Sequence, residues 1–246
     1  NIAAPGNPKV LAEVDCGVEQ GDIGVYGNLV FRSIDLPVVA DTPEETCTDE
    51  FADGAGFEVV QIFQVDDPKK ASADDLVTAV ATDCGSHTHT VVPDPANDRV
   101  LIYVANSAVG PEYAAGDTVW GHQCSEPHNK FQIIEVPLDA PEDAALLADV
   151  PLGLDPTGAH TSCHDIGVLQ NKGTDLAVCA AGHAVIFDIS DPAAPTKLTD
   201  FTAPGVTTWH SAAFSWDGSV TVMGWEPGGG IFPRCLATGA PLAPFD

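Results

Sequence analysis

Four histidines occupy positions where their imidazoles could act together in the folded chain. His87 and His89 lie in the stretch "CGSHTHTVV", His164 lies in "SCHDIGV" and His210 lies in "WHSAAF". Each stretch places histidine directly before, or within, a short apolar run that is typical of a β-strand. Imidazole nitrogens are common ligands of zinc, copper, iron and nickel, so several of them at one point would form a site for a transition metal ion.

These histidines recur at one position when the apolar runs are aligned. Aligning "GDIGV", "HTVV", "HDIGV" and "HSAAF" puts Gly21, His89, His164 and His210 in one column. The last step, 210 − 164 = 46 residues, has the length of one propeller blade, about 40–50 residues. The other steps, 89 − 21 = 68 and 164 − 89 = 75, carry insertions. His87 is expected to share a strand face with His89, because residues i and i+2 of a strand point to the same side.

The elements that must position this column are short β-strands. Apolar runs alternate with Pro, Gly, Asp and Asn turn signals, and the best candidate for a helix is the short segment 141–150. Four copies of a strand–turn–strand unit are recognisable, "AVIFDISDPAAPTKLTDF" among them. Repeats of about four strands predict a β-propeller, whose innermost strands face a central channel. We therefore expect an all-β propeller with four blade repeats, in a single domain over residues 1–246; a β-sandwich would produce no such column.

Cysteine usage indicates a protein folded in an oxidising compartment. Two of the insertions, "DLPVVADTPEETCTDEFADGAG" and "NSAVGPEYAAGDTVWGHQCSEPHN", contain cysteine and are expected to be long loops held by disulfides. No CxxC pair occurs, which excludes a zinc ribbon or a thioredoxin motif. We expect three disulfides of undetermined connectivity, with one thiol left over, among Cys16, Cys47, Cys84, Cys124, Cys163, Cys179 and Cys235.

Charge and hydropathy limit the partners. The formal net charge is −27, from 36 acidic and 9 basic residues, so nucleic acid and anionic lipid would be repelled. No apolar run approaches the roughly 18 residues of a membrane-spanning segment. The chain begins at Asn1 without a leader, which we interpret as a mature secreted protein whose signal peptide has been removed. The charge suits a secreted, a salt-adapted or a cation-binding protein, and composition leaves these three open.

Several motifs, in order along nearly the whole chain, resemble one family. The unit "FDISDPAAP" is similar to the turn unit of LVIVD-repeat propellers, the secreted bacterial and archaeal group that includes the choice-of-anchor proteins. The elements "QGDIGVYGNLVFRS", "CGSHTHT", "SCHDIGV", "WHSAAFSWDG" and "GGG…PRC" follow the order of that group. The resemblance implies a propeller and a secreted location, but no reaction. Relatives continue past the "PRC" element into further blades, so it also implies either a chain truncated at its C-terminus, as part of a larger ring, or a ring of few blades.

The propeller would bring the histidines to the mouth of the channel. A metal held there with an open coordination position could act as a Lewis acid or activate water or oxygen, as in a metal-dependent hydrolase, lyase or oxidase. The expected ligands of this zinc, copper, iron or nickel ion are His87, His89, His164 and His210.

Three further residues could complete the site. Asp165 and Glu226 could each add a carboxylate or orient an imidazole ring, and His160 could enter the channel mouth. Acidic loops such as "DTPEETCTDEFADG" could bind calcium, although their spacing is not that of an EF-hand. GxSxG, P-loop and HExxH motifs do not occur, so no other reaction is indicated and the sequence leaves open whether the protein is an enzyme.

A second class of function competes with the metal site. In this alternative, the propeller is an extracellular interaction module that presents its loops to a small molecule, a glycan or a protein partner. The histidines would then be structural and would hydrogen-bond to the neighbouring blade.

Overall fold

The computed structural model describes residues 5–14, 21–34, 59–106, 128–155, 161–171 and 173–225. Over these ranges the chain forms fourteen strands and three 3-10 turns, in antiparallel sheets that follow chain order. Blade 1 contains β1 (Ile23–Tyr26), β2 (Leu29–Ile34), β3 (Val59–Gln64) and β4 (Leu76–Ala81). Blade 2 contains β5 (Thr88–Asp94), β6 (Arg99–Ala105), β7 (Lys130–Pro137) and β8 (Ala145–Pro151).

The second half of the chain continues the pattern. Blade 3 contains β9 (Asp165–Asn171), β10 (Thr174–Ala180), β11 (Ala184–Asp188) and β12 (Thr196–Phe201). The described part of blade 4 is the hairpin of β13 (Trp209–Phe214) and β14 (Thr221–Trp225). Short 3-10 turns lie in the connections before β4, β6 and β8, namely η3 (Ala73–Asp75), η4 (Pro95–Asn97) and η6 (Pro141–Asp143).

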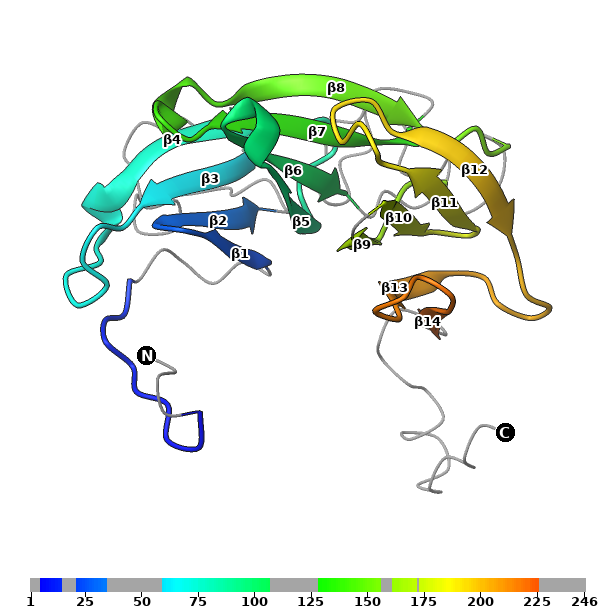
Figure 1. Cartoon of the computed structure of the whole chain (residues 1–246), viewed down its shortest axis with the longest axis horizontal. Helices are drawn as coiled ribbons and strands as arrows, with labels where there is room; N and C mark the ends of the chain where they lie inside the picture. The colour runs from blue at the N-terminus through cyan, green and yellow to red at the C-terminus, as the bar shows by residue number, and fades with distance from the viewer. Residues whose placement is uncertain are drawn as a thin grey trace, which may run out of the picture.

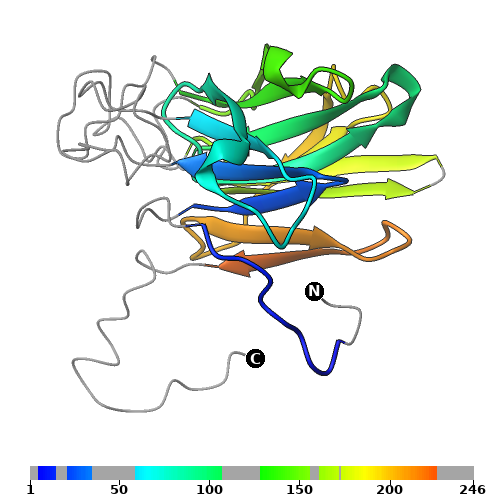
Figure 2. The ribbon, with the colours of Figure 1, turned by 90° about the vertical axis from the view of Figure 1, so that its left-hand side faces the viewer.

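The four sheets form an arc around a common centre, with the first strand of each sheet innermost (Figure 1). Strand β5 lies beside β1 and β9, and β9 lies beside β13, so the blades follow one another in sequence order. The inner hairpins of blades 1 and 4 run in nearly the same direction (Figure 2). This arrangement is a β-propeller, and the all-β prediction with four blade repeats is confirmed. Within the described ranges, no strand joins β14 to β1.

The core lies between the blades, and β6 shows how the sequence builds it. Side chains of a strand alternate between its two faces. Val100, Ile102 and Val104 pack toward blade 1, in a cluster that includes Phe31. Leu101 and Tyr103 pack toward blade 3. The run "RVLIYVA" is therefore apolar at nearly every position because both of its faces are buried.

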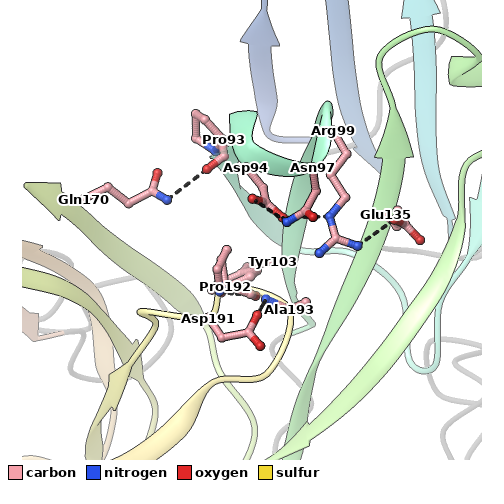
Figure 3. A network of polar contacts seen from close by, with 10 residues as sticks. All are labelled: Pro93, Asp94, Asn97, Arg99, Tyr103, Glu135, Gln170, Asp191, Pro192 and Ala193. Carbon is pink, nitrogen blue, oxygen red and sulfur yellow. Dashed lines mark hydrogen bonds and ion pairs between the residues drawn. The ribbon is translucent and has the colours of Figure 1, made fainter. Parts of the chain in front are cut away.

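Blades 2 and 3 are also joined by polar contacts, at the ends of β5 and β9 and between β6 and the β11–β12 connection (Figure 3). The Gln170 side-chain amide donates to the Pro93 carbonyl over 2.9 Å, and the Tyr103 hydroxyl donates to the Pro192 carbonyl over 2.6 Å. Within blade 2, the Arg99 guanidinium forms ion pairs with Asp94 at 2.7 Å and with Glu135 at 2.6 Å. The contacts of Gln170 and Arg99 lie at the end of β5 that is away from His87.

One helix prediction is wrong. Segment 141–150 forms η6 followed by β8, rather than a helix. β8 pairs with the exposed edge of β7 along its length, and the backbone hydrogen bonds available at that edge outweigh the local helix preference of "DAALLADV".

Disulfides are present, as expected for an oxidising compartment. Cys163, which precedes β9, is bonded to Cys179 in β10, and both residues are fully buried. Cys84 is disulfide-bonded as well. The remaining four cysteines and nearly all of both cysteine-bearing insertions lie outside the described residues. Within the described part of the chain, no helix is long and apolar enough to cross a bilayer.

Candidate functional site

Two carboxylates link the inner strands of neighbouring blades and fix their alignment. Asp22 accepts hydrogen bonds from the backbone N–H of the next residue, at 2.9 Å, and from that of His89 in blade 2, at 3.1 Å. Asp165 does the same with the next residue, at 2.8 Å, and with Ala212 in blade 4, at 3.2 Å. Asp22 and Asp165 therefore occupy equivalent positions, and so do His89 and Ala212.

Gly21 and His164 directly precede the two aspartates, so Gly21 is equivalent to His164. His87 and His210 each lie two residues before a recipient N–H group, so these two histidines are equivalent as well. The backbone N–H groups of His87 and His164 support this alignment, since each donates to the carbonyl of the last residue of the adjacent strand, at 2.8 Å and 2.7 Å. The histidine column is thus present, but its member in blade 2 is His87 rather than His89. The sequence alignment was off by two residues in that blade because "HTH" offers two histidines separated by the period of a strand.

The structure brings His87, His164 and His210 together, and we call these three residues the histidine cluster. The ring centroids of His87 and His164 are 4.4 Å apart, and those of His164 and His210 are 4.2 Å apart. His210 is exposed, and the other two are half-buried. Three successive blades therefore each contribute one imidazole to the same end of the inner strands.

A backbone contact orients the central ring of the cluster. His164 Nδ1 lies 2.9 Å from the backbone carbonyl oxygen of His210. A carbonyl can only accept, so Nδ1 carries the proton, and the lone pair of the neutral ring is on Nε2. The Thr88 hydroxyl donates to the carbonyl of His164 over 2.8 Å and fixes the backbone from the other side.

His89 lies away from the cluster, in the interface between blades 1 and 2. Its side chain is 6% exposed, its Nδ1 is 2.7 Å from Ser33 Oγ, and its ring meets the Phe31 ring edge-on. Its Nε2 has no hydrogen-bond partner among the described residues. Burial lowers the pKa of His89 to about 4, against the opposing effect of the Asp22 carboxylate. His89 is therefore a neutral core residue near pH 7.

The donor chemistry of the cluster suits a transition metal, although its arrangement is not that of a bound site. Among the described residues, no three His, Cys, Asp or Glu side chains are disposed to hold a metal ion. The rings contact one another through edges and faces. Coordination at the usual 2.0–2.1 Å, roughly, would require the rings to turn their nitrogens toward one point. The backbone bond to Nδ1 of His164 is the kind that orients a metal-ligating imidazole in known sites.

The other predicted site residues contribute less. Both carboxylate oxygens of Asp165 are used by backbone N–H groups, and burial raises the pKa of this carboxyl. Asp165 is thus a structural link between blades 3 and 4. Glu226, His160 and the acidic loop 41–54 lie outside the described residues.

Sequence reasoning missed the residues that hold the inner strands together. Asp22, Thr88 and Ser33 have no conspicuous motif of their own. A usable signal existed in the repeated triplet Asp-Ile-Gly, which begins at both Asp22 and Asp165. Because inter-blade bonds join residues more than 40 positions apart, only the fold reveals what the triplet does.

Comparison of the sequence with protein-family models and with curated proteins gives no match. Solved structures with a similar fold include a protein from Lactobacillus plantarum, with 11% identity and a TM-score of 0.48, over 82% of this chain and 47% of that one. An exo-β-1,3-galactanase from Phanerochaete chrysosporium has 10% identity and a TM-score of 0.42, over 78% and 40%. The chain spans less than half the length of both structures. The class defined here, the β-propeller, rests on the order and arrangement of the four sheets. The resemblance to LVIVD-repeat proteins stays a prediction.

Proposed function

We propose that this chain is a secreted β-propeller that binds a divalent transition metal, such as zinc, copper, iron or nickel, through the histidine cluster. The observation that carries the proposal is the contact between imidazoles from three successive blades, at 4.4 Å and 4.2 Å between ring centroids. Packing alone gives little reason to place histidine at the same position of three blades. The net charge of −27 also favours the accumulation of cations at the surface.

The surroundings of His164 support the proposal further. Its Nδ1–H is held by the His210 carbonyl, so Nε2 is the available donor atom. A bound metal would supply a Lewis acid at this end of the inner strands. Asp22 and Asp165 are occupied by backbone N–H groups and are not assigned as bases, so the proposal concerns binding and assigns no reaction.

The buried Cys163–Cys179 disulfide supports the secreted part of the proposal. Stable structural disulfides form in oxidising compartments and are rare in reducing ones.

A second candidate function is an extracellular interaction module with structural histidines. The contact of His164 Nδ1 with the backbone of blade 4 favours it, because that contact would join blades 3 and 4 without a metal. The partner would be a protein, a glycan or a small molecule that contacts the loops of the propeller.

Metal titration of tag-free protein separates the two candidates. Calorimetry with zinc or nickel, in millimolar magnesium to occupy surface carboxylates, should give one site per chain. The His164→Ala variant should bind at least about 10-fold more weakly and should stay folded by circular dichroism. His183→Ala is the matched control, since His183 is half-exposed and pairs with Asp200 at 2.9 Å, outside the cluster. Absence of metal binding, with a lower melting temperature for His164→Ala, would instead favour the structural function.

A further inference from the structure

The two end blades expose apolar sheet faces that are buried in the other blades. On β1, Ile23 is 57% exposed and Val25 is 62% exposed, and both point to one face. On the blade 4 hairpin, Val222 is 62% exposed, and Val220 on the same side is 52% exposed. We call these surfaces the blade 1 face and the blade 4 face. Uncharged surfaces of this kind are notable in a chain with 36 acidic residues.

The alignment of the blades shows what covers the equivalent face in blades 2 and 3. The position of Ile23 is held by His89 in blade 2 and by Ile166 in blade 3, which are 6% and 2% exposed. His89 packs against blade 1, and Ile166 belongs to the core cluster shared with blade 2. This face therefore packs against the preceding blade wherever one is present.

The blade 4 face is of the opposite kind. Through strand pairing, the position of Val222 corresponds to Phe31 in blade 1, Tyr103 in blade 2 and Val178 in blade 3. These three residues are fully buried. Phe31 contacts His89 of the following blade, and Tyr103 bonds to Pro192 of the following blade. The blade 4 face is thus the face that packs against a following blade.

The chain contains three junctions between blades, namely 1 with 2, 2 with 3, and 3 with 4. In each junction, a face equivalent to the blade 4 face packs against a face equivalent to the blade 1 face. The two exposed faces are therefore complementary. Within one chain, blades 1 and 4, which carry these faces, lie at the two ends of the arc (Figure 1). We propose that they meet between two copies of the chain, the blade 4 face of each copy packing on the blade 1 face of the other. Two such junctions, related by a two-fold axis, close a ring of eight blades.

A cavity on the blade 1 side suits the docking of a second copy of the chain. A cavity of about 440 Å³ lies on the blade 1 face beside residues 11–14, lined by Ile23, Val30 and Phe63 among others, and can receive apolar side chains. Arg32 also lines it, but its side chain is buried and its Nη1 donates to the Gln61 side chain over 3.0 Å, so the face stays largely apolar. The inference does not depend on metal binding by the histidine cluster.

Light scattering and sedimentation of the 246-residue chain test the proposal. In about 0.5 M NaCl, which screens the repulsion between acidic copies, the wild type should have twice the 25.5 kDa mass of one chain. Val25→Asp and Val222→Asp should each be monomeric, because each places a charge in both junctions. Both side chains are largely exposed within one copy, so the variants should remain folded.

The control variant and a mixing experiment sharpen the test. Leu198→Asp, on the outer strand β12 and 56% exposed, should remain dimeric. Mixing Val25→Asp with Val222→Asp restores one of the two junctions and should yield a weak heterodimer. A wild type that is monomeric up to high micromolar concentration, or a dimer that neither variant weakens, would overturn the proposal.

Discussion

His87 and His89 are identical side chains two residues apart, yet their surroundings differ. His89 lies within β5 and is buried against Ser33 and Phe31 of blade 1. His87 precedes the strand and contacts His164 of blade 3. The difference arises because the alternation of a strand applies only to its paired residues, and His87 lies at the point where pairing begins.

Because the His89 imidazole is buried, we expect the protein to lose folding stability in mild acid. His89 has a folded-state pKa of about 4, below the value of about 6.5 in an unfolded chain. Between these values the unfolded state binds a proton that the folded state does not, so the free energy of unfolding falls as the pH is lowered. The full effect of this residue is about 3 kcal/mol near pH 4 and absent above pH 7.

Urea denaturation across this pH range provides the measurement. His89→Gln should remove most of the additional slope of unfolding free energy against pH, while His183→Gln, at a half-exposed position, should keep it. Equal slopes in the wild type and His89→Gln would contradict the assignment of His89 as a buried neutral group.

At the scale of the strands, close approach between blades depends on small residues. A Cβ atom added at Gly24 would lie 2.6 Å from both His89 Nε2 and the Val91 side chain. One added at Gly167 would collide with the backbone carbonyl of Ala212. Each glycine is the last residue of an Asp-Ile-Gly triplet. The triplet therefore supplies both the carboxylate that bonds to the next blade and the glycine that leaves room for that blade.

Gly167→Ala should therefore force blades 3 and 4 apart. We expect a loss of about 1–3 kcal/mol in the free energy of unfolding, because a backbone carbonyl cannot move aside as a flexible side chain can. Gly6→Ala is the control, since nothing lies within 4 Å of its added Cβ, and it should be neutral. Chemical denaturation of both variants is the measurement, and an unchanged Gly167→Ala variant would contradict the packing described here.

At the scale of the whole molecule, charge repulsion dominates the surface. Even if every basic residue paired with a different carboxylate, 36 − 9 = 27 acidic residues would remain without a basic partner. The repulsion among them opposes the compact state and is weakened by salt.

Thermal stability should consequently rise between about 0.1 and 2 M NaCl, as screening shortens the range of repulsion. Differential scanning calorimetry gives the melting temperature, and the Val222→Asp variant should show the same trend if the effect is within one chain rather than between copies. A melting temperature that is flat or falling over this range would reject the salt-adapted interpretation of the composition.

The sequence predicts the blades well because each blade repeats an apolar strand pattern between turn signals. It predicts the position of His164 and His210 for the same reason. The alignment places His89 rather than His87 in the column, because the correct choice depends on bonds from Asp22 to a strand in another blade. The strand β8 was mistaken for a helix because the sequence does not show the edge of β7 with which it pairs.

The bonds from Asp22 and Asp165 to main-chain N–H groups have an evolutionary consequence. Every residue except proline carries the atom that these carboxylates hold, so the receiving blade is free to change its side chain there without losing the bond. Histidine at one recipient position and alanine at the other illustrate this freedom. Duplicated blades could thus diverge in sequence and acquire separate roles while remaining interchangeable as building units.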